Sequence, residues 1–135
     1  MVRVNIIEPR NLADQHLVAE YLEIIMLTAY IKKYPEKEGI PKNYCLGRGH
    51  MKFFKDKLGY LKKRHENLKQ EMRRRGFKAS KIIRVNCNKC SWKPGKDDFK
   101  IIKKRLKMKL RLKPNYYRYY GEYKSVGFFV RLLKD

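Results

Sequence analysis

Apolar residues recur with the spacing of an α-helix in three stretches of the chain. These stretches run from about Leu12 to Lys33, from about Met51 to Arg75 and from about Lys96 to Lys113. Gly76 follows the second stretch, where a helix C-terminal cap is expected, and Pro114 ends the third. The pattern therefore predicts three long helices.

Alternation typical of β-strands is scarce in this sequence. The best candidate is Ile82–Val85, which is only four residues long. We find no internal repeat, no low-complexity linker and no clear boundary between two domains. The sequence therefore predicts an all-α fold, a compact single domain over residues 1–135 with about three helices and long connecting loops.

The charge of the chain points to the class of its partner. The 35 Lys and Arg residues exceed the 13 Asp and Glu residues and give a formal net charge of +22. This is far more than solubility requires, so we expect a polyanion as partner. A hydrophobic content of 43% excludes a disordered basic tail. The composition thus indicates a folded nucleic-acid-binding protein, without naming an activity.

The sequence also bears on where the protein works. The start of the chain lacks the long apolar segment of a secretory signal, and the apolar run Ile24–Leu27 is far too short to span a bilayer. Three cysteines, an odd number, suit a reducing compartment better than a disulfide framework. We therefore expect a cytoplasmic monomer with no membrane partner.

Two of the cysteines form the motif Cys87-x-x-Cys90, which is half of a zinc site. Completing the site would require Cys45, His50 or His65 to lie close in space. Two ordinary thiols are the favoured interpretation, and we expect neither a metal ion nor another cofactor.

The segment Pro114–Gly121 contains four tyrosines around Arg118. Tyrosine and arginine side chains stack on nucleobases, and arginine also binds phosphates. A tyrosine cluster can equally be the cap of a small core. The eight cations and no acid between Lys103 and Arg118 favour nucleic acid, because a core cap does not need such a concentration of like charge.

The first predicted helix carries polar residues on one side. His16, Glu20 and Glu23 follow the spacing i, i+4 and i+7, which places them on one helical face. The face is either solvated or part of a pocket suited to acid–base chemistry. A second motif, Gly47-Arg48-Gly49-His50, opens the next helix and suggests a phosphate site, but it is too short to be specific.

Three blocks of sequence carry a resemblance to a known family: Arg3-x-Asn5 with the stretch 12–23, then Leu46-Gly47-x-Gly49-His50, and finally Pro114–Gly121. Together they resemble the phage pyrimidine-dimer DNA glycosylase family, also called phage endonuclease V. The resemblance covers most of residues 1–121 and is weakest at 78–93. The tail from about residue 122 is longer than is usual in that family.

The resemblance implies a small, mainly helical enzyme that acts on cyclobutane pyrimidine dimers in duplex DNA. Its nucleophile is an N-terminal α-amine, here that of Val2 after removal of Met1, which forms an imine with the sugar and leads to strand cleavage as an abasic-site lyase. Glu23 matches the catalytic carboxylate. The residues expected at the DNA are Arg3, Gln15, His16, Arg48, Arg105, Lys109, Tyr116, Tyr117, Arg118 and Tyr119.

Several departures from the family pattern keep two alternatives open. Val2 replaces a threonine, which spares the backbone amine, and Tyr116 replaces a tryptophan. Leu22 and Met26 stand where arginines are expected, which favours as an alternative an enzyme for abasic or oxidised sites. The second alternative is a non-catalytic basic protein that binds DNA or RNA.

Overall fold

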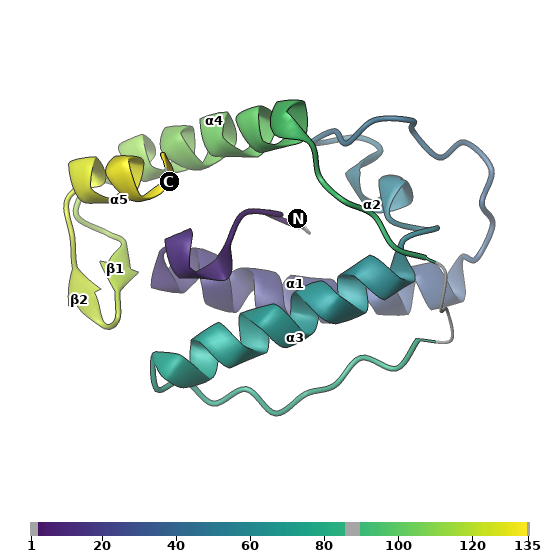
Figure 1. The fold of residues 1–135 in the computed structure, drawn as a ribbon, viewed down its shortest axis with the longest axis horizontal. Coiled ribbons are helices and arrows are strands. Elements are labelled where there is room, and N and C mark those ends of the chain that lie inside the picture. The colour runs from purple at the N-terminus through teal and green to yellow at the C-terminus, as the bar shows by residue number, and fades with distance from the viewer. Residues whose placement is uncertain (1–2, 86–89, 135) are drawn as a thin grey trace.

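The computed structural model describes residues 3–85 and 90–134, and over these ranges the protein is helical. Figure 1 shows α1 and α3 running side by side, with α4 and α5 on the opposite side of the N-terminal segment. In chain order the elements are the 3-10 helix η1 (Pro9–Asn11), α1 (Asp14–Lys33), α2 (His50–Phe53), α3 (Leu58–Arg74), α4 (Lys96–Leu112), β1 (Arg118–Tyr119), β2 (Glu122–Tyr123) and α5 (Val126–Leu132). The all-α prediction is confirmed.

Helices α1 and α4 follow their predicted ranges closely because their local sequence supports both ends. Lys32 and Lys33 occupy the last turn of α1, where cations favour the helix dipole. Helix α4 begins with a capping arrangement in which the Asp98 carboxylate accepts a hydrogen bond from the Gly95 N–H at 2.8 Å. One face of α4, formed by Ile102, Leu106 and Leu110, is buried.

The predicted helix over residues 51–75 is interrupted between α2 and α3. Phe53 and Phe54 are both almost fully buried. Consecutive side chains of a helix point about 100° apart, and here the chain leaves the helix at Phe54, so both rings enter the same aromatic cluster. Burial of adjacent aromatic rings therefore overrides the helical periodicity at this point.

The strand suggested at Ile82–Val85 is absent, so that expectation was wrong. Ile83 is buried but Ile82 is 65% exposed, and no strand within residues 3–85 and 90–134 pairs with this segment. Among the described residues, the strands are instead β1 and β2, which pair antiparallel. Tyr120 and Gly121 adopt positive φ angles of 53° and 81° in the turn between them.

The core is one cluster that extends from Val4 near the start of the chain to Leu133 near its end. The tail beyond residue 122 belongs to it, because Phe129 and Leu133 are buried beside Leu106 and Leu110 of α4. Within the described ranges, no helix combines the length and the apolar character needed to cross a membrane.

Candidate active site and DNA-binding surface

A pocket of about 210 Å³ opens between the N-terminal segment, α1 and α4. It gathers six of the residues that the sequence placed at the site, together with three neighbours. The lining residues are Arg3, Asn5, His16, Ala19, Glu23, Arg105, Leu106, Lys109 and Tyr117. Residues from the N-terminal segment, α1, α4 and the segment after α4 therefore meet at one cavity.

Among the described residues that line this pocket, Glu23 is the one acid. It is partly buried, and its Oε2 accepts a hydrogen bond from the Arg3 backbone N–H at 3.0 Å. Burial raises the pKa of the Glu23 carboxyl above its usual range, and the hydrogen bond from Arg3 offsets part of that effect. The carboxylate is thus held against the N-terminal segment in a partly desolvated setting.

Three cations, Arg3, Arg105 and Lys109, also line the pocket. Burial and the nearby Arg105 lower the pKa of Arg3. Burial, with Lys109 and Arg105 close by, lowers the pKa of His16 to about 4, so this imidazole is neutral at pH 7. The His16 ring lies 4.7 Å from that of Tyr117. Cations that repel one another indicate a site for an anionic ligand.

Glu20 does not join His16 and Glu23 in the pocket. It is fully buried and forms a bidentate ion pair with Arg64 of α3, with N–O distances of 2.7 and 2.9 Å. A helix turns about 100° per residue, so Glu20 is rotated about 60° from Glu23, towards α3. The predicted shared face therefore divides into a pocket side and a core side, and the solvated-face alternative is wrong for Glu20.

Gln15 connects α1 with the tyrosine-rich segment. Its side-chain amide donates to the Tyr116 carbonyl at 2.9 Å and accepts from the Arg118 N–H at 3.0 Å. Tyr117, between these two residues, is buried at the pocket, whereas Tyr116 and Arg118 are exposed. Gln15 thus anchors the segment that presents these side chains.

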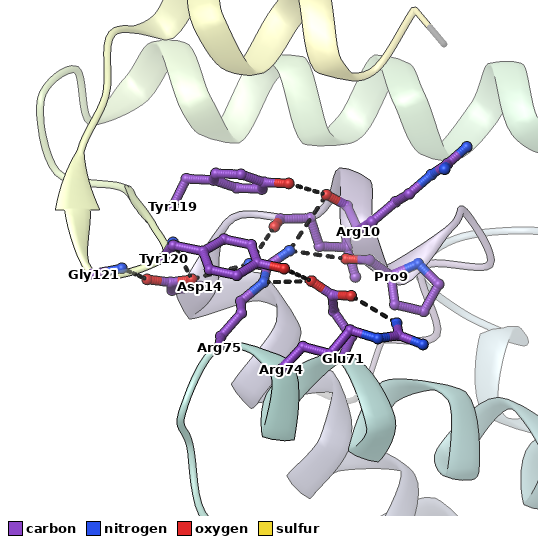
Figure 2. A network of polar contacts seen from close by, with 10 residues as sticks. Pro9, Arg10, Asp14, Glu71, Arg74, Arg75, Tyr119, Tyr120 and Gly121 are labelled. Atoms are coloured by element: carbon purple, nitrogen blue, oxygen red, sulfur yellow. Dashed lines mark hydrogen bonds and ion pairs between the residues drawn. The ribbon is translucent and has the colours of Figure 1, made fainter.

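Tyr119 and Tyr120 lie away from the pocket, at the network drawn in Figure 2. The Arg75 guanidinium lies against both rings, 4.6 Å from the centre of the Tyr119 ring and 5.0 Å from that of Tyr120. The Tyr119 hydroxyl donates to the Arg10 carbonyl, and the Tyr120 hydroxyl donates to Glu71. The tyrosine cluster therefore serves partly as a cap of the core and partly as a wall of the pocket.

The remaining predicted residues lie elsewhere. Arg48 is exposed in the loop before α2 and does not line the pocket. Val2 lies outside the described residues. Asn5 is a lining residue that the sequence analysis did not select, although it belongs to the Arg3-x-Asn5 motif.

Cys87 also lies outside the described residues, and Cys90 is disulfide-bonded. The interpretation of Cys90 as an ordinary thiol is therefore wrong. His50 and His65, considered as further zinc ligands, are occupied otherwise: His50 accepts a hydrogen bond from Val4, and His65 stacks on Tyr21. Over the described part of the chain, no cluster of three or more His, Cys, Asp and Glu residues is suited to a metal ion.

The fold and the pocket together define a small helical protein with a cationic cavity built around one carboxylate and the N-terminal segment. The family model for pyrimidine dimer DNA glycosylase matches residues 1–84. The chain therefore belongs to the pyrimidine dimer DNA glycosylase family. The matched region includes Arg3, His16 and Glu23. Arg105 and Lys109 lie outside it, on α4, and line the same pocket in the folded structure.

Proposed function

We propose that this protein is a DNA repair glycosylase that acts on cyclobutane pyrimidine dimers in duplex DNA and then cleaves the strand through an imine. The observation that carries the proposal is the contact between the Arg3 N–H and the Glu23 carboxylate inside a cationic pocket. It holds an acid next to the start of the chain, where an α-amine nucleophile belongs.

Covalent geometry supports this placement of the amine. The Val2 nitrogen is three bonds from the Arg3 nitrogen and lies within roughly 4 Å of it at any torsion angle. Since Glu23 Oε2 lies 3.0 Å from the Arg3 nitrogen, the amine lies at most roughly 7 Å from this oxygen. An α-amine has a pKa of about 8, so a usable fraction is unprotonated near neutral pH.

In the proposed reaction, the amine lone pair forms a bond to the sugar C1′ as the bond from C1′ to the pyrimidine nitrogen breaks. The base leaves with that electron pair and takes up a proton. Cleavage of C1′–O4′ with protonation of O4′ leaves the imine. Glu23 stabilises the cationic sugar and accepts the C2′ proton, and β-elimination then expels the 3′ phosphate.

The cations and aromatic residues of the pocket have a separate role in the proposed reaction: they bind the DNA. Arg105 and Lys109 bind backbone phosphates, which position the duplex without reading its sequence, whereas Arg3 holds the lesion together with His16. Neutral His16 offers hydrogen bonds to the lesion without adding another like charge. Tyr117 supplies an aromatic wall beside it.

A second candidate function keeps the chemistry and changes the lesion. Leu22 and Met26 are 46% and 60% exposed on α1, on either side of Glu23 in the sequence. Apolar side chains at this position favour an enzyme for abasic or oxidised sites over strict dimer recognition. A pure DNA- or RNA-binding protein is disfavoured, because a carboxylate facing phosphates weakens binding.

The test compares supercoiled plasmid with and without ultraviolet irradiation, scored for nicks. Selective nicking of irradiated DNA supports dimer recognition, whereas selective nicking of plasmid with abasic sites supports the second candidate. Borohydride is then added to trap the imine, and the adduct is mapped by mass spectrometry after removal of Met1 has been checked. Absence of any adduct from protein with a free N-terminus contradicts the proposed function.

A further inference from the structure

We propose that Tyr44 and His50 are positioning residues of the reaction, which hold the backbone N–H and carbonyl of Val4 and thereby keep the N-terminal segment against Glu23. This inference rests on the proposed function, because it assigns these residues a role in aligning the α-amine. Neither residue lines the pocket, so they act through the backbone and not on the DNA.

The two residues hold Val4 from both of its backbone polar groups. The Val4 N–H donates to His50 Nε2 at 2.9 Å, and the Tyr44 hydroxyl donates to the Val4 carbonyl at 2.9 Å. Val4 is fully buried, as are Tyr44 and His50 to within 2%. We call these two hydrogen bonds the Val4 clamp.

The Val4 clamp lies directly beside the catalytic contact. Arg3 donates its N–H to Glu23 on α1, and the next residue donates its N–H to His50 on α2. The segment is therefore held between two elements at consecutive residues. A shift of Val4 moves the Arg3 amide, and with it the attached nucleophile, relative to Glu23.

The tautomer of His50 suits this role. Burial lowers the pKa of His50 to about 4, so the ring is neutral at physiological pH. Its Nδ1 lies 2.7 Å from the Cys45 carbonyl, which can only accept, so Nδ1 carries the proton. Nε2 is thus left with the lone pair that the Val4 N–H requires.

The motif before α2 explains how His50 reaches this position. Gly49 has a φ of +94°, and a Cβ there would approach Pro41 Cγ to 3.2 Å and Cys45 Sγ to 3.5 Å. Only glycine fits this conformation and this space without strain. The Gly47-x-Gly49-His50 motif, which the sequence suggested as a phosphate site, therefore turns His50 inward towards Val4.

Tyr44 is held just as firmly. Its ring stacks on Trp92 at 6.0 Å and meets Phe53 and Phe54 edge to face at 5.9 and 6.3 Å. A ring packed on several sides cannot follow a drifting backbone, so its hydroxyl defines a fixed point. The aromatic cluster thus fixes the position of the Tyr44 hydroxyl that takes part in the Val4 clamp.

The test uses variants that differ only in their contact to Val4. Tyr44→Phe removes one hydroxyl. His50→Gln keeps an acceptor near the Nε2 position, whereas His50→Asn is too short to reach Val4. Tyr60→Phe is the control, because Tyr60 lies in the same aromatic cluster, 5.1 Å from Trp92, and no hydrogen bond from its hydroxyl to Val4 occurs among the described residues.

Each variant is assayed for the single-turnover rate of borohydride-trapped imine, for affinity to a dimer-containing duplex and for melting temperature. We expect Tyr44→Phe and His50→Asn to lower the trapping rate about 10- to 100-fold, the effect typical of a misplaced reacting group. Affinity should change less than about threefold, because the phosphate contacts are intact. His50→Gln and Tyr60→Phe should trap at close to the wild-type rate.

The outcomes separate this inference from the proposed function. Wild-type protein with a free N-terminus that yields no adduct contradicts both. A wild-type adduct at the α-amine, with Tyr44→Phe trapping as fast as Tyr60→Phe, leaves the proposed function standing and overturns the Val4 clamp. Should His50→Asn fail to fold, Tyr44→Phe decides the question, since it removes a single atom.

Discussion

Two clusters of arginines and tyrosines, one at the pocket and one around Arg75, contain the same residue types but differ in charge balance. The Arg75 side chain is fully buried and pairs with Asp14 and Glu71 at 2.9 Å each, and its other donors reach backbone carbonyls. Among the described residues that line the pocket, the cations are Arg3, Arg105 and Lys109 and the acid is Glu23.

The two clusters therefore differ in how far carboxylates balance the charge of the cations beside them. Asp14 accepts from the N–H groups of Tyr120 and Gly121 as well as from Arg75, so the Arg75 cluster joins α1, α3 and the C-terminal segment with its charges balanced. At the pocket, burial lowers the pKa of His16 and of Arg3, and the neighbouring cations lower both further. An anion that enters the pocket reduces the repulsion between the cations that line it. An anion near Arg75 gains little, because Asp14 and Glu71 already neutralise the charge of this arginine.

The largest effect expected from this contrast is the salt dependence of DNA binding. With roughly six to ten phosphate contacts, affinity should fall about three to five decades between 50 and 200 mM salt. Arg105→Ala and Lys109→Ala should each weaken binding to damaged and undamaged duplex alike and reduce the slope by about one. Fluorescence anisotropy across a salt series measures both, and a flat salt response would exclude the electrostatic surface.

The next effect concerns Glu23, the acid at the pocket. Glu23→Gln keeps the acceptor for the Arg3 N–H but removes the charge, so lesion DNA should still bind while base release slows about 100- to 10,000-fold. Single-turnover base release from a dimer duplex measures this. Turnover at the wild-type rate would show that the acid–base chemistry lies elsewhere.

Breaking the Arg75 cluster should affect stability more than chemistry. Arg75→Met leaves Asp14 and Glu71 buried without their main partner, which should lower the free energy of unfolding by about 3–5 kcal/mol. Arg74→Ala is the matched control: Arg74 also pairs with Glu71 but is 64% exposed, so we expect a loss of about 1 kcal/mol or less. Urea titration compares the two, and equal losses would contradict the structural role of Arg75.

The smallest effect is the pH dependence of stability. The pKa of His16 falls from an unfolded value near 6.5 to about 4 in the folded state, so the unfolded chain binds more protons between these values. The contribution of His16 to the free energy of unfolding is therefore complete above about pH 6.5. It declines as the pH falls towards 4, by up to about 1.4 kcal/mol per pH unit. His16→Gln should reduce the slope of unfolding free energy against pH in this window; an unchanged slope would contradict the assignment.

Much of this arrangement could be predicted from local sequence. The periodicity of α1 and α4 is strong, and their ends carry residues that favour termination, so both helices were predicted closely. The helical spacing also placed His16 and Glu23 on a common side, and both line the pocket. The break at Phe54 escaped prediction, because it depends on the cluster that receives the ring.

The sequence by itself determined the charge excess, the three long helices and the spacing of the polar residues on α1, because these depend on composition and on neighbours within a few turns. Only the tertiary structure decided that Glu20 pairs with Arg64 while Glu23 meets Arg3, and that His50 and Tyr44 hold Val4. These partners lie 20 to 46 residues apart in the chain. No local pattern encodes such contacts, since they arise from packing one element against another.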